Sequence, residues 1–188
     1  MRTHKQLAFY QSILDTLSEP GCPFCRFLKD YQAARLQHHS ENRIRSLCNF
    51  HTWGLAAVQN ALTAAQVFID LVESASAKAD GTVACDLCQE ISAEEDRRIR
   101  EFVGCVHRRS VVDWLRQDAV LCIPHGVKLR RQLPLVLSAR VETILEKSRR
   151  QLVEELETLR NTPQSDRPGW GALGRAAEFL VAQRGLHE

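Results

Sequence analysis

The sequence is poor in aromatic side chains and in net charge. Aromatic residues make up only 6% of its 188 residues, whereas 44% are hydrophobic, so aliphatic and alanine side chains must fill most of any core. That composition suits helices. The net charge of +2 is too small to indicate binding to nucleic acid or to an acidic membrane surface. Charge therefore points to no class of partner.

The sequence also lacks a hydrophobic run that would predict a membrane span or a secretion signal. Residues 1–6 lead into a mixed segment without the apolar core and small-residue cleavage site of a signal peptide. The most apolar stretch, residues 55–72, is interrupted by polar side chains: Gln59, Asn60, Thr63, Gln66 and Asp70. We expect a cytoplasmic protein without a membrane segment, whose seven cysteines serve metal or redox chemistry rather than disulfides.

Alternation of apolar and polar residues with a period of two is missing as well, which argues against β-strands. Apolar residues recur instead at spacings of three and four, the pattern of amphipathic helices. The predicted helices cover residues 3–17, 22–36, 48–72, 89–102, 111–115, 125–132, 134–159 and 170–184. We expect residues 48–72 to form the central core helix, with an apolar stripe made of Leu55, Val58, Leu62, Ala65, Ile69 and Val72. In the last helix, the side chains expected to point inward are Trp170, Leu173, Ala177, Leu180 and Val181.

Cysteine and histidine form one pattern twice: a CxxC pair is followed, a few tens of residues later, by LCxxH. The two sets are Cys22, Cys25, Cys48 and His51, and then Cys85, Cys88, Cys122 and His125. Zinc prefers four tetrahedral thiolate and imidazole ligands, and a CxxC turn brings two sulfurs to one ion. We predict that each set binds one zinc ion, so that the chain holds two; an iron–sulfur cluster is the alternative.

The ligands are expected at helix starts. Residues one and four of a helix's first turn lie on one face, so the cysteine and histidine of LCxxH can point together. The positive end of the helix dipole also stabilises a thiolate. Each ion would then staple two helix starts, which predicts an all-α helical bundle with two metal-stapled repeats, residues 1–80 and 81–160. Residues 161–188 would add a linker and a C-terminal docking helix, and we expect one compact unit.

Other motifs fail on their context. Residues 21–25 resemble the CPxC of thioredoxin-like oxidoreductases, but a predicted helix precedes them where those enzymes have a strand. Arg26 and Gln89 stand where a covalent haem site would have histidine. Residues 169–174 match GxGxxG but follow a proline-bearing linker. No nucleophile elbow, phosphate loop or HExxH is present, so we do not expect an enzyme.

Three further candidates lie outside the two sets. Cys105 could be a reserve ligand or a redox-active thiol, but we favour a small core residue. His38 and His39 are adjacent, and neighbouring helical residues do not share a face, so we favour solvent exposure over metal binding.

With these residues assembled, the chain resembles a family of uncharacterised prokaryotic proteins defined by tandem CPxC…LCxxH motifs. The matching pieces span nearly the whole chain: GCPFCRFL, SLCNFHTW, CDLC, VLCIPH and the terminal WGALGRAAEFLVA. The resemblance implies a helical metal-binding protein with no established reaction, and places the ligands at the eight positions already named. The chain departs from the pattern at Asp86, where the second CPxC would have proline, and in a shorter connection before the first LCxxH.

Complete four-ligand sets leave no open coordination position for a substrate. We therefore predict a non-enzymatic, zinc-stapled scaffold or adaptor that binds another protein. One alternative is a redox-responsive or iron–sulfur sensor, suggested by the number of cysteines. A second is a nucleic-acid-binding regulator, suggested by the arginine pairs at 97–98, 108–109, 130–131 and 149–150. Acidic residues interleave those pairs, which favours a solvated surface.

Overall fold

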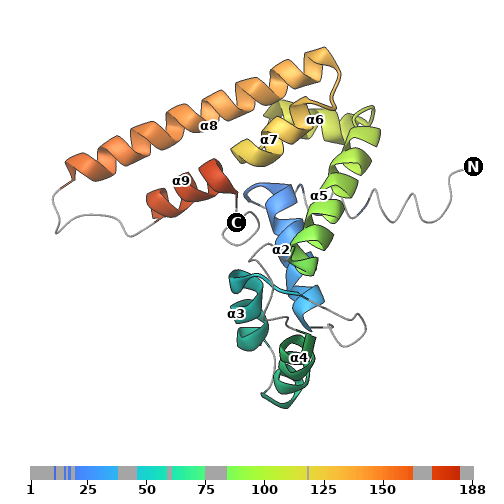
Figure 1. Ribbon diagram of the computed structural model, residues 1–188. Coiled ribbons are helices and arrows are strands. Elements are labelled where there is room, and N and C mark those ends of the chain that lie inside the picture. The colour runs from blue at the N-terminus through green and yellow to red at the C-terminus, as the bar shows by residue number, and fades with distance from the viewer. Residues whose placement is uncertain are drawn as a thin grey trace, which may run out of the picture. The chain divides into compact units, whose positions relative to one another are not determined.

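The computed structural model describes residues 11, 15, 17, 20–37, 46–58, 61–74, 84–117, 119–162 and 171–182. Within these residues every regular element is a helix (Figure 1), so the all-α prediction is confirmed. The helices are α2 (Pro23–Gln37), α3 (Asn49–Val58), α4 (Ala61–Ser74), α5 (Asp86–Gly104), α6 (Arg109–Gln117), α7 (Ile123–Arg130), α8 (Leu135–Asn161) and α9 (Gly171–Val181). Among these helices, none has the length and apolarity needed to cross a membrane. Trp170, His38, His39 and most of the predicted first helix lie outside the described residues.

The chain divides into two compact units, and their boundaries do not coincide with the predicted repeats at 1–80 and 81–160. Unit 1 comprises Met1–Phe27 and Arg97–Glu188, and unit 2 comprises Leu28–Asp96. The boundaries fall inside α2 and inside α5, so each unit combines segments of both repeats. Instead of one compact unit made of two sequential repeats, the chain forms unit 2 as an insertion within unit 1.

The core of unit 1 gathers side chains from the start of α2, the end of α5, and α6, α7 and α8. Its buried members are Phe24, Ile99, Phe102, Val111, Leu115, Leu121, Leu129, Leu133, Val141 and Ile144. Phe24 packs edge-on against Phe102, with ring centroids 5.5 Å apart. On α6 the two buried residues, Val111 and Leu115, are four residues apart and so share one helix face. Arg140 of α8 donates from Nε to the Leu115 carbonyl at 2.9 Å, which satisfies an acceptor in the last turn of α6.

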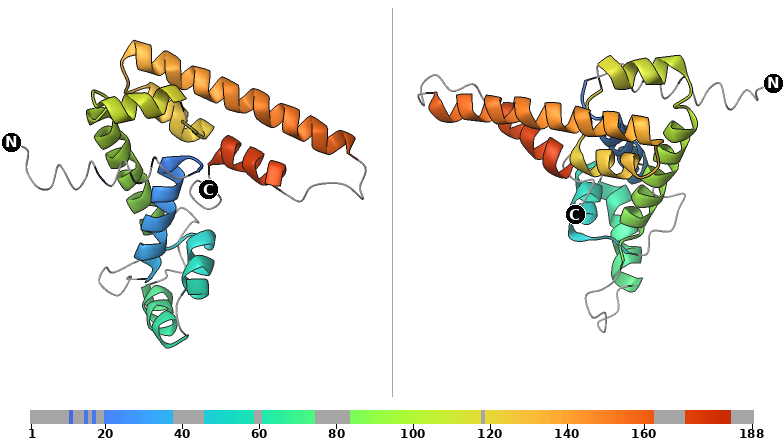
Figure 2. Two further views of the ribbon diagram at one scale, coloured as in Figure 1. Left: turned by 180° about the vertical axis from the view of Figure 1, so that it is seen from behind. Right: turned by 90° about the horizontal axis from the view of Figure 1, so that it is seen from above.

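Helices α7, α8 and α9 pack together in unit 1 (Figure 2). A glycine allows the close approach of α7 to α8: a Cβ at Gly126 would lie 2.8 Å from Leu145 Cδ1. Arg175 of α9 forms an ion pair with Glu155 of α8, with N and O 2.7 Å apart. The predicted long helix and C-terminal docking helix are therefore present as α8 and α9.

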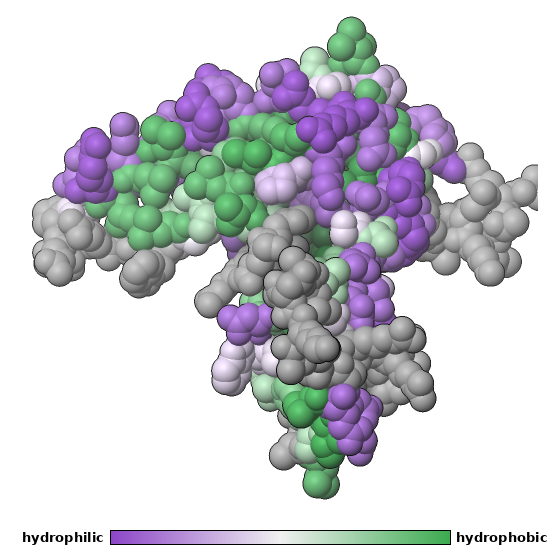
Figure 3. Space-filling view, in the orientation of Figure 1, coloured by the Kyte–Doolittle hydropathy of each residue, from purple (hydrophilic) through white to green (hydrophobic). Residues whose placement is uncertain are grey.

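The inward face predicted for α9 is wrong. Leu173, Leu180 and Val181 are exposed, and Figure 3 shows apolar side chains on the surface over α8 and α9. The half-buried residues of the helix include Ala176 and Phe179 instead. Apolar residues occur on more than one face of α9, so periodicity alone could not decide which face packs.

In unit 2 the predicted central core helix is replaced by two helices, α3 and α4. Leu55 of α3 and Ala64 of α4 are buried, but Leu62 is 87% exposed and Val72 is 72% exposed. The prediction is wrong because a helical stripe shows which face is more apolar, not whether another element covers that face.

The buried side chains of unit 2 come mainly from the parts of α2 and α5 that belong to it, and from α3. They include Leu28, Leu36, Leu55, Leu87 and Ile91. A Cβ at Gly54 would lie 3.3 Å from Leu36 Cδ1, so this glycine lets α3 approach α2 closely. Arg35 of α2 donates two hydrogen bonds to the Glu90 carboxylate of α5, at 2.7 and 2.9 Å. This bidentate pair fixes the two segments beside each other.

Candidate metal centres

All eight predicted ligands fall in two clusters, but not in the predicted combinations. The unit 1 cluster consists of Cys22, Cys25, Cys122 and His125, and the unit 2 cluster consists of Cys48, His51, Cys85 and Cys88. In each cluster the four ligand atoms all lie within 4.8 Å of one another, so each could hold a metal ion. Each CxxC is completed by the LCxxH of the other repeat. The predicted sequential pairing is therefore wrong.

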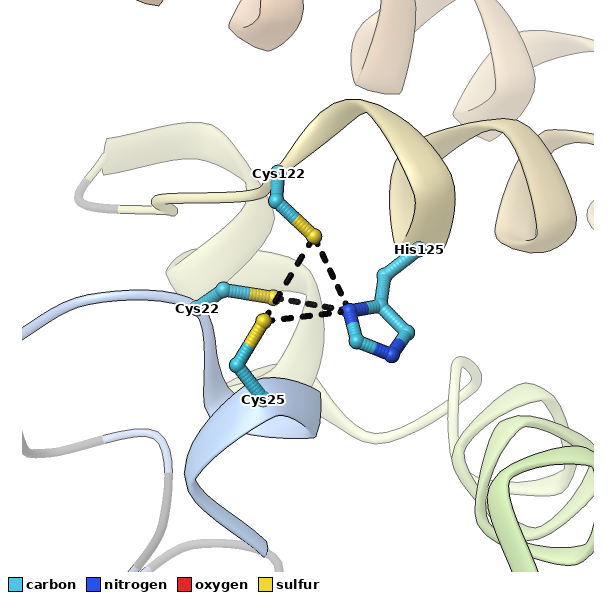
Figure 4. Close-up of side chains that lie close together, drawn as sticks. All are labelled: Cys22, Cys25, Cys122 and His125. Carbon is cyan, nitrogen blue, oxygen red and sulfur yellow. Dashed lines mark hydrogen bonds between the residues drawn. The ribbon is translucent and has the colours of Figure 1, made fainter. Parts of the chain in front are cut away.

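The unit 1 cluster joins the start of α2 to the start of α7 (Figure 4). His125 Nδ1 faces the sulfurs of Cys22, Cys25 and Cys122 at 3.5, 3.3 and 2.9 Å. The sulfurs of Cys25 and Cys122 are 3.6 Å apart. Cys25, Cys122 and His125 are buried, and Cys22 is half-buried.

The unit 2 cluster joins the start of α3 to the start of α5 in the same way. His51 Nδ1 lies 3.3 Å from the sulfurs of Cys48 and Cys85 and 3.4 Å from that of Cys88. The sulfurs of Cys48 and Cys88 are 3.8 Å apart. His51 and Cys85 are buried, whereas Cys48 and Cys88 are half-buried.

All four motifs build the same local geometry, as predicted for helix starts. The first cysteine of each motif stands just before or at the start of its helix, and its carbonyl accepts from the N–H four residues later. These bonds run from Arg26 to Cys22, Thr52 to Cys48, Gln89 to Cys85 and Gly126 to Cys122. The second ligand of each motif then lies in the first helical turn, on the same face. Each CxxC or CxxH therefore forms a local two-donor unit at a helix start.

The turn before the first motif has its own conformational requirement. Gly21 has φ of +95°, a backbone conformation that glycine adopts without steric cost. The Arg26 side chain donates from α2 back to the Pro20 carbonyl. The Gly21 conformation and this hydrogen bond fix the turn that precedes Cys22. In the sequence, Arg26 was notable only because it stands where a covalent haem site would have histidine.

Two residues that the sequence analysis did not assign hold the segments of the unit 2 cluster together. The Ser46 N–H donates to the Asp86 carboxylate at 3.2 Å, and the Asp86 N–H donates to the Ser46 carbonyl at 3.1 Å. Ser46 also donates from its hydroxyl to the Ala84 carbonyl. These bonds align the chain before Cys48 with the chain around Cys85. The only signal in the sequence was that Asp86 replaces the expected proline.

In the unit 1 cluster the close approach of the sulfurs shifts the pKa values of Cys22 and Cys122 in opposite directions. Burial raises the pKa of the Cys22 thiol, but hydrogen bonds with Cys122, Cys25 and His125 outweigh it and hold that pKa well below its usual range. The same contacts with Cys22 and Cys25, together with burial, raise the pKa of Cys122. The cluster therefore favours loss of the Cys22 proton over loss of the Cys122 proton, because adjacent thiolates repel each other.

The unit 2 cluster behaves similarly. Burial raises the pKa of Cys85, but hydrogen bonds with Cys48 and Cys88 outweigh this effect and lower it. Burial and the nearby sulfurs of Cys85 and Cys48 raise the pKa of Cys88 to about 12. A bound divalent cation would offset the repulsion between thiolates, and its binding must displace the remaining protons.

The donor spacing fits one tetrahedral ion in each cluster. A metal–sulfur bond of about 2.3 Å in a tetrahedron places two ligand sulfurs about 3.8 Å apart. The sulfurs of Cys25 and Cys122 lie 3.6 Å apart in unit 1, and those of Cys48 and Cys88 lie 3.8 Å apart in unit 2. Three sulfurs and one imidazole nitrogen would fill the four positions of such an ion in each cluster.

Among the described residues, Cys105 belongs to neither cluster. It packs against the unit 1 core, as predicted for a small core residue. Burial raises the pKa of its thiol, which keeps it in the less reactive protonated form. Cys105 is therefore not one of the clustered donor residues.

Comparison with known proteins provides no relative for this chain. No family model, curated protein or solved structure matches it. Its function is therefore inferred from the two clusters and the helices that hold them.

Proposed function

We propose that this is a zinc-binding helical protein in which two structural three-cysteine, one-histidine centres organise a scaffold or adaptor for another protein. The observation that carries the proposal is that eight donors form two complete sets, each located at two helix starts. Sites with four protein ligands serve structure, whereas catalytic zinc sites keep one position open for water or substrate.

Zinc is proposed on the chemistry and spacing of the donors. Three thiolates and an imidazole suit zinc and disfavour magnesium and calcium, which prefer oxygen ligands. An iron–sulfur cluster would place several iron and sulfide atoms between the cysteine sulfurs and hold them farther apart than one ion does. In each cluster all four donor atoms lie within 4.8 Å of one another, which favours the single ion.

The four donors of each cluster would hold two helix starts together when zinc is bound. In unit 1 these are the starts of α2 and α7, and in unit 2 the starts of α3 and α5. Because the ligands exist in this arrangement only in the folded chain, the free energy of metal binding contributes to folding. The ions would therefore maintain the fold rather than carry out a reaction.

A protein partner is proposed because complete metal sites serve structure and because unit 2 exposes large apolar side chains. Trp53 on α3 and Leu62 on α4 are both largely exposed. The ion pairs of the arginines weigh against nucleic acid as the partner. Arg130 pairs with Glu142 at 3.2 Å, and Arg149 pairs with Glu146 at 2.7 Å, so acidic side chains lie beside these positive charges.

Metal analysis of protein purified without added metal tests the proposal. We expect two zinc ions for each chain and no visible absorption. Removal by a chelator should lower the helical content, and adding zinc should restore it. Iron with visible absorption would favour the iron–sulfur alternative, and a metal-free protein that keeps its full helical content would overturn the proposal.

A further inference from the structure

A cavity of about 340 Å³ in unit 1 reaches the unit 1 cluster. Its wall includes all three cysteines of that cluster, together with side chains of α8 and α9. A small molecule in this cavity could therefore reach the cysteine ligands of the unit 1 cluster.

We propose that this cavity admits a small organic electrophile of the α,β-unsaturated carbonyl class, and that Cys22 is the residue it modifies. The proposal goes beyond the scaffold function and rests on the ligand assignment in unit 1. Modification of Cys22 would then weaken metal binding in the unit 1 cluster, whereas the unit 2 cluster would serve structure alone.

Of the three cysteines that line the cavity, Cys22 is the most exposed residue. Cys25 is 5% exposed and Cys122 is 3% exposed, whereas Cys22 is half-buried. Cys22 also precedes α2, in the segment that follows the turn at Gly21, whereas Cys25 lies inside the first helical turn. An incoming molecule therefore meets Cys22 with the least displacement of the protein.

The size and lining of the cavity suit an organic molecule better than a peroxide. A volume of about 340 Å³ has room for many water-sized molecules, so a single peroxide would leave most of the cavity unfilled. Val120, Leu152 and Phe179 supply apolar wall. Arg175 supplies N–H donors for a carbonyl oxygen, because its contacts with Glu155 use only Nε and one terminal nitrogen.

The chemistry requires no oxidant and no leaving group. A cysteine that binds a metal is deprotonated, and the thiolate is the nucleophilic form. The Cys22 sulfur forms a carbon–sulfur bond at the β-carbon, and the π electrons of the carbon–carbon double bond move to give an enolate. Water then protonates the α-carbon and leaves hydroxide. The product is a neutral thioether, which binds zinc more weakly than a thiolate does. The zinc-mediated connection between the starts of α2 and α7 should therefore weaken.

The unit 2 cluster supplies an internal comparison. Cys48 and Cys88 are also half-buried, but neither lines this cavity. Because Cys22, Cys48 and Cys88 are all half-buried, exposure alone gives no reason for Cys22 to react first. Preferential modification of Cys22 would therefore report the cavity.

The test uses N-ethylmaleimide, an α,β-unsaturated imide, on metal-loaded protein. A Cys105→Ser background removes the cysteine outside the clusters. With the reagent limiting, peptide mass spectrometry should find Cys22 modified about fivefold or more faster than Cys48 or Cys88. One metal ion should be released for each Cys22 adduct, as measured with a chromogenic chelator.

Equal modification of the three cysteines, or earlier modification of Cys48 or Cys88, would overturn the inference. Metal analysis before treatment keeps this outcome separate from failure of the proposed function. Protein with two ions and an unreactive Cys22 removes the inference alone, whereas protein without metal removes the scaffold proposal on which it rests.

Filling the cavity provides a second, independent measurement. Ser148 lines the cavity from α8, and Thr143 is an exposed residue of the same helix. Ser148→Phe should slow modification of Cys22 by about tenfold while keeping two ions bound, and Thr143→Phe should change neither quantity. Unchanged modification in a folded Ser148→Phe protein would overturn the cavity route. If that variant does not fold, the order of modification in the parent protein decides.

Discussion

Replacing Cys25 and Cys122 together by serine should remove one metal ion, whereas replacing Cys25 and Cys48 together should remove two. The sulfurs of Cys25 and Cys122 lie 3.6 Å apart in the unit 1 cluster, so the first pair of substitutions damages one site twice. Cys48 belongs to the unit 2 cluster, so the second pair damages both sites. If each CxxC instead shared its ion with the LCxxH next along the chain, the two double variants would behave in the opposite way.

The free energy involved is large compared with the stability of a domain. Structural zinc contributes about 10–16 kcal/mol in zinc-finger peptides, and whole domains are stable by about 5–15 kcal/mol. The entropy cost of closing the chain into a loop differs little between the two sites. Cys25 and Cys122 are 97 residues apart and Cys48 and Cys88 are 40 apart, which corresponds to about 0.8 kcal/mol of loop-closure entropy. Loss of either ion should therefore unfold most of its own unit.

Metal content per chain distinguishes the two pairings. It is measured by elemental mass spectrometry on protein purified without added metal. Urea unfolding should also show that the effects of Cys25→Ser and Cys122→Ser are strongly non-additive, because both remove the same ion. One ion retained by the Cys25 and Cys48 double variant, with none retained by the Cys25 and Cys122 double variant, would refute the cross-pairing.

Three further outcomes are expected. Gly126→Ala should destabilise unit 1 by about 1–3 kcal/mol in urea unfolding, because the added Cβ would lie 2.8 Å from Leu145 Cδ1. Gly174→Ala, whose added Cβ would meet nothing within 4 Å, should be neutral or stabilising by up to about 1 kcal/mol, and equal effects of the two variants would contradict this packing. The pKa of Cys88 is raised to about 12, so its proton must leave before the sulfur binds metal, and acid should weaken binding. The apparent affinity of the unit 2 cluster should fall about tenfold per pH unit for each displaced proton in chelator competition between about pH 8 and pH 6, and a pH-independent affinity would argue against this coupling. Cys105→Ser should keep two ions and change stability only modestly, since Cys105 lies outside both clusters; loss of a full equivalent of metal would show that the ligand assignment is incomplete.

The sequence alone determined the features that depend on a few neighbouring residues. Helical spacing of apolar residues predicted α8 and most of the other helices closely enough to establish the all-α fold, although it merged α3 and α4 into one helix. Each CxxC or CxxH places two donors on one face because a helical turn brings residues three apart together. The eight donors and their location at helix starts could therefore be predicted without knowledge of the tertiary structure.

Only the tertiary structure decided which two-donor units meet. Cys22 and Cys25 join Cys122 and His125, 97 or more positions along the chain, because α2 begins in the same core as α7, with Phe24 packed against the ring of His125. Local spacing is the same for every motif and carries no information about such distant neighbours. For the same reason the apolar stripe of α4 could not be assigned: its periodicity marks a face, but whether that face is buried depends on which other segments pack against it.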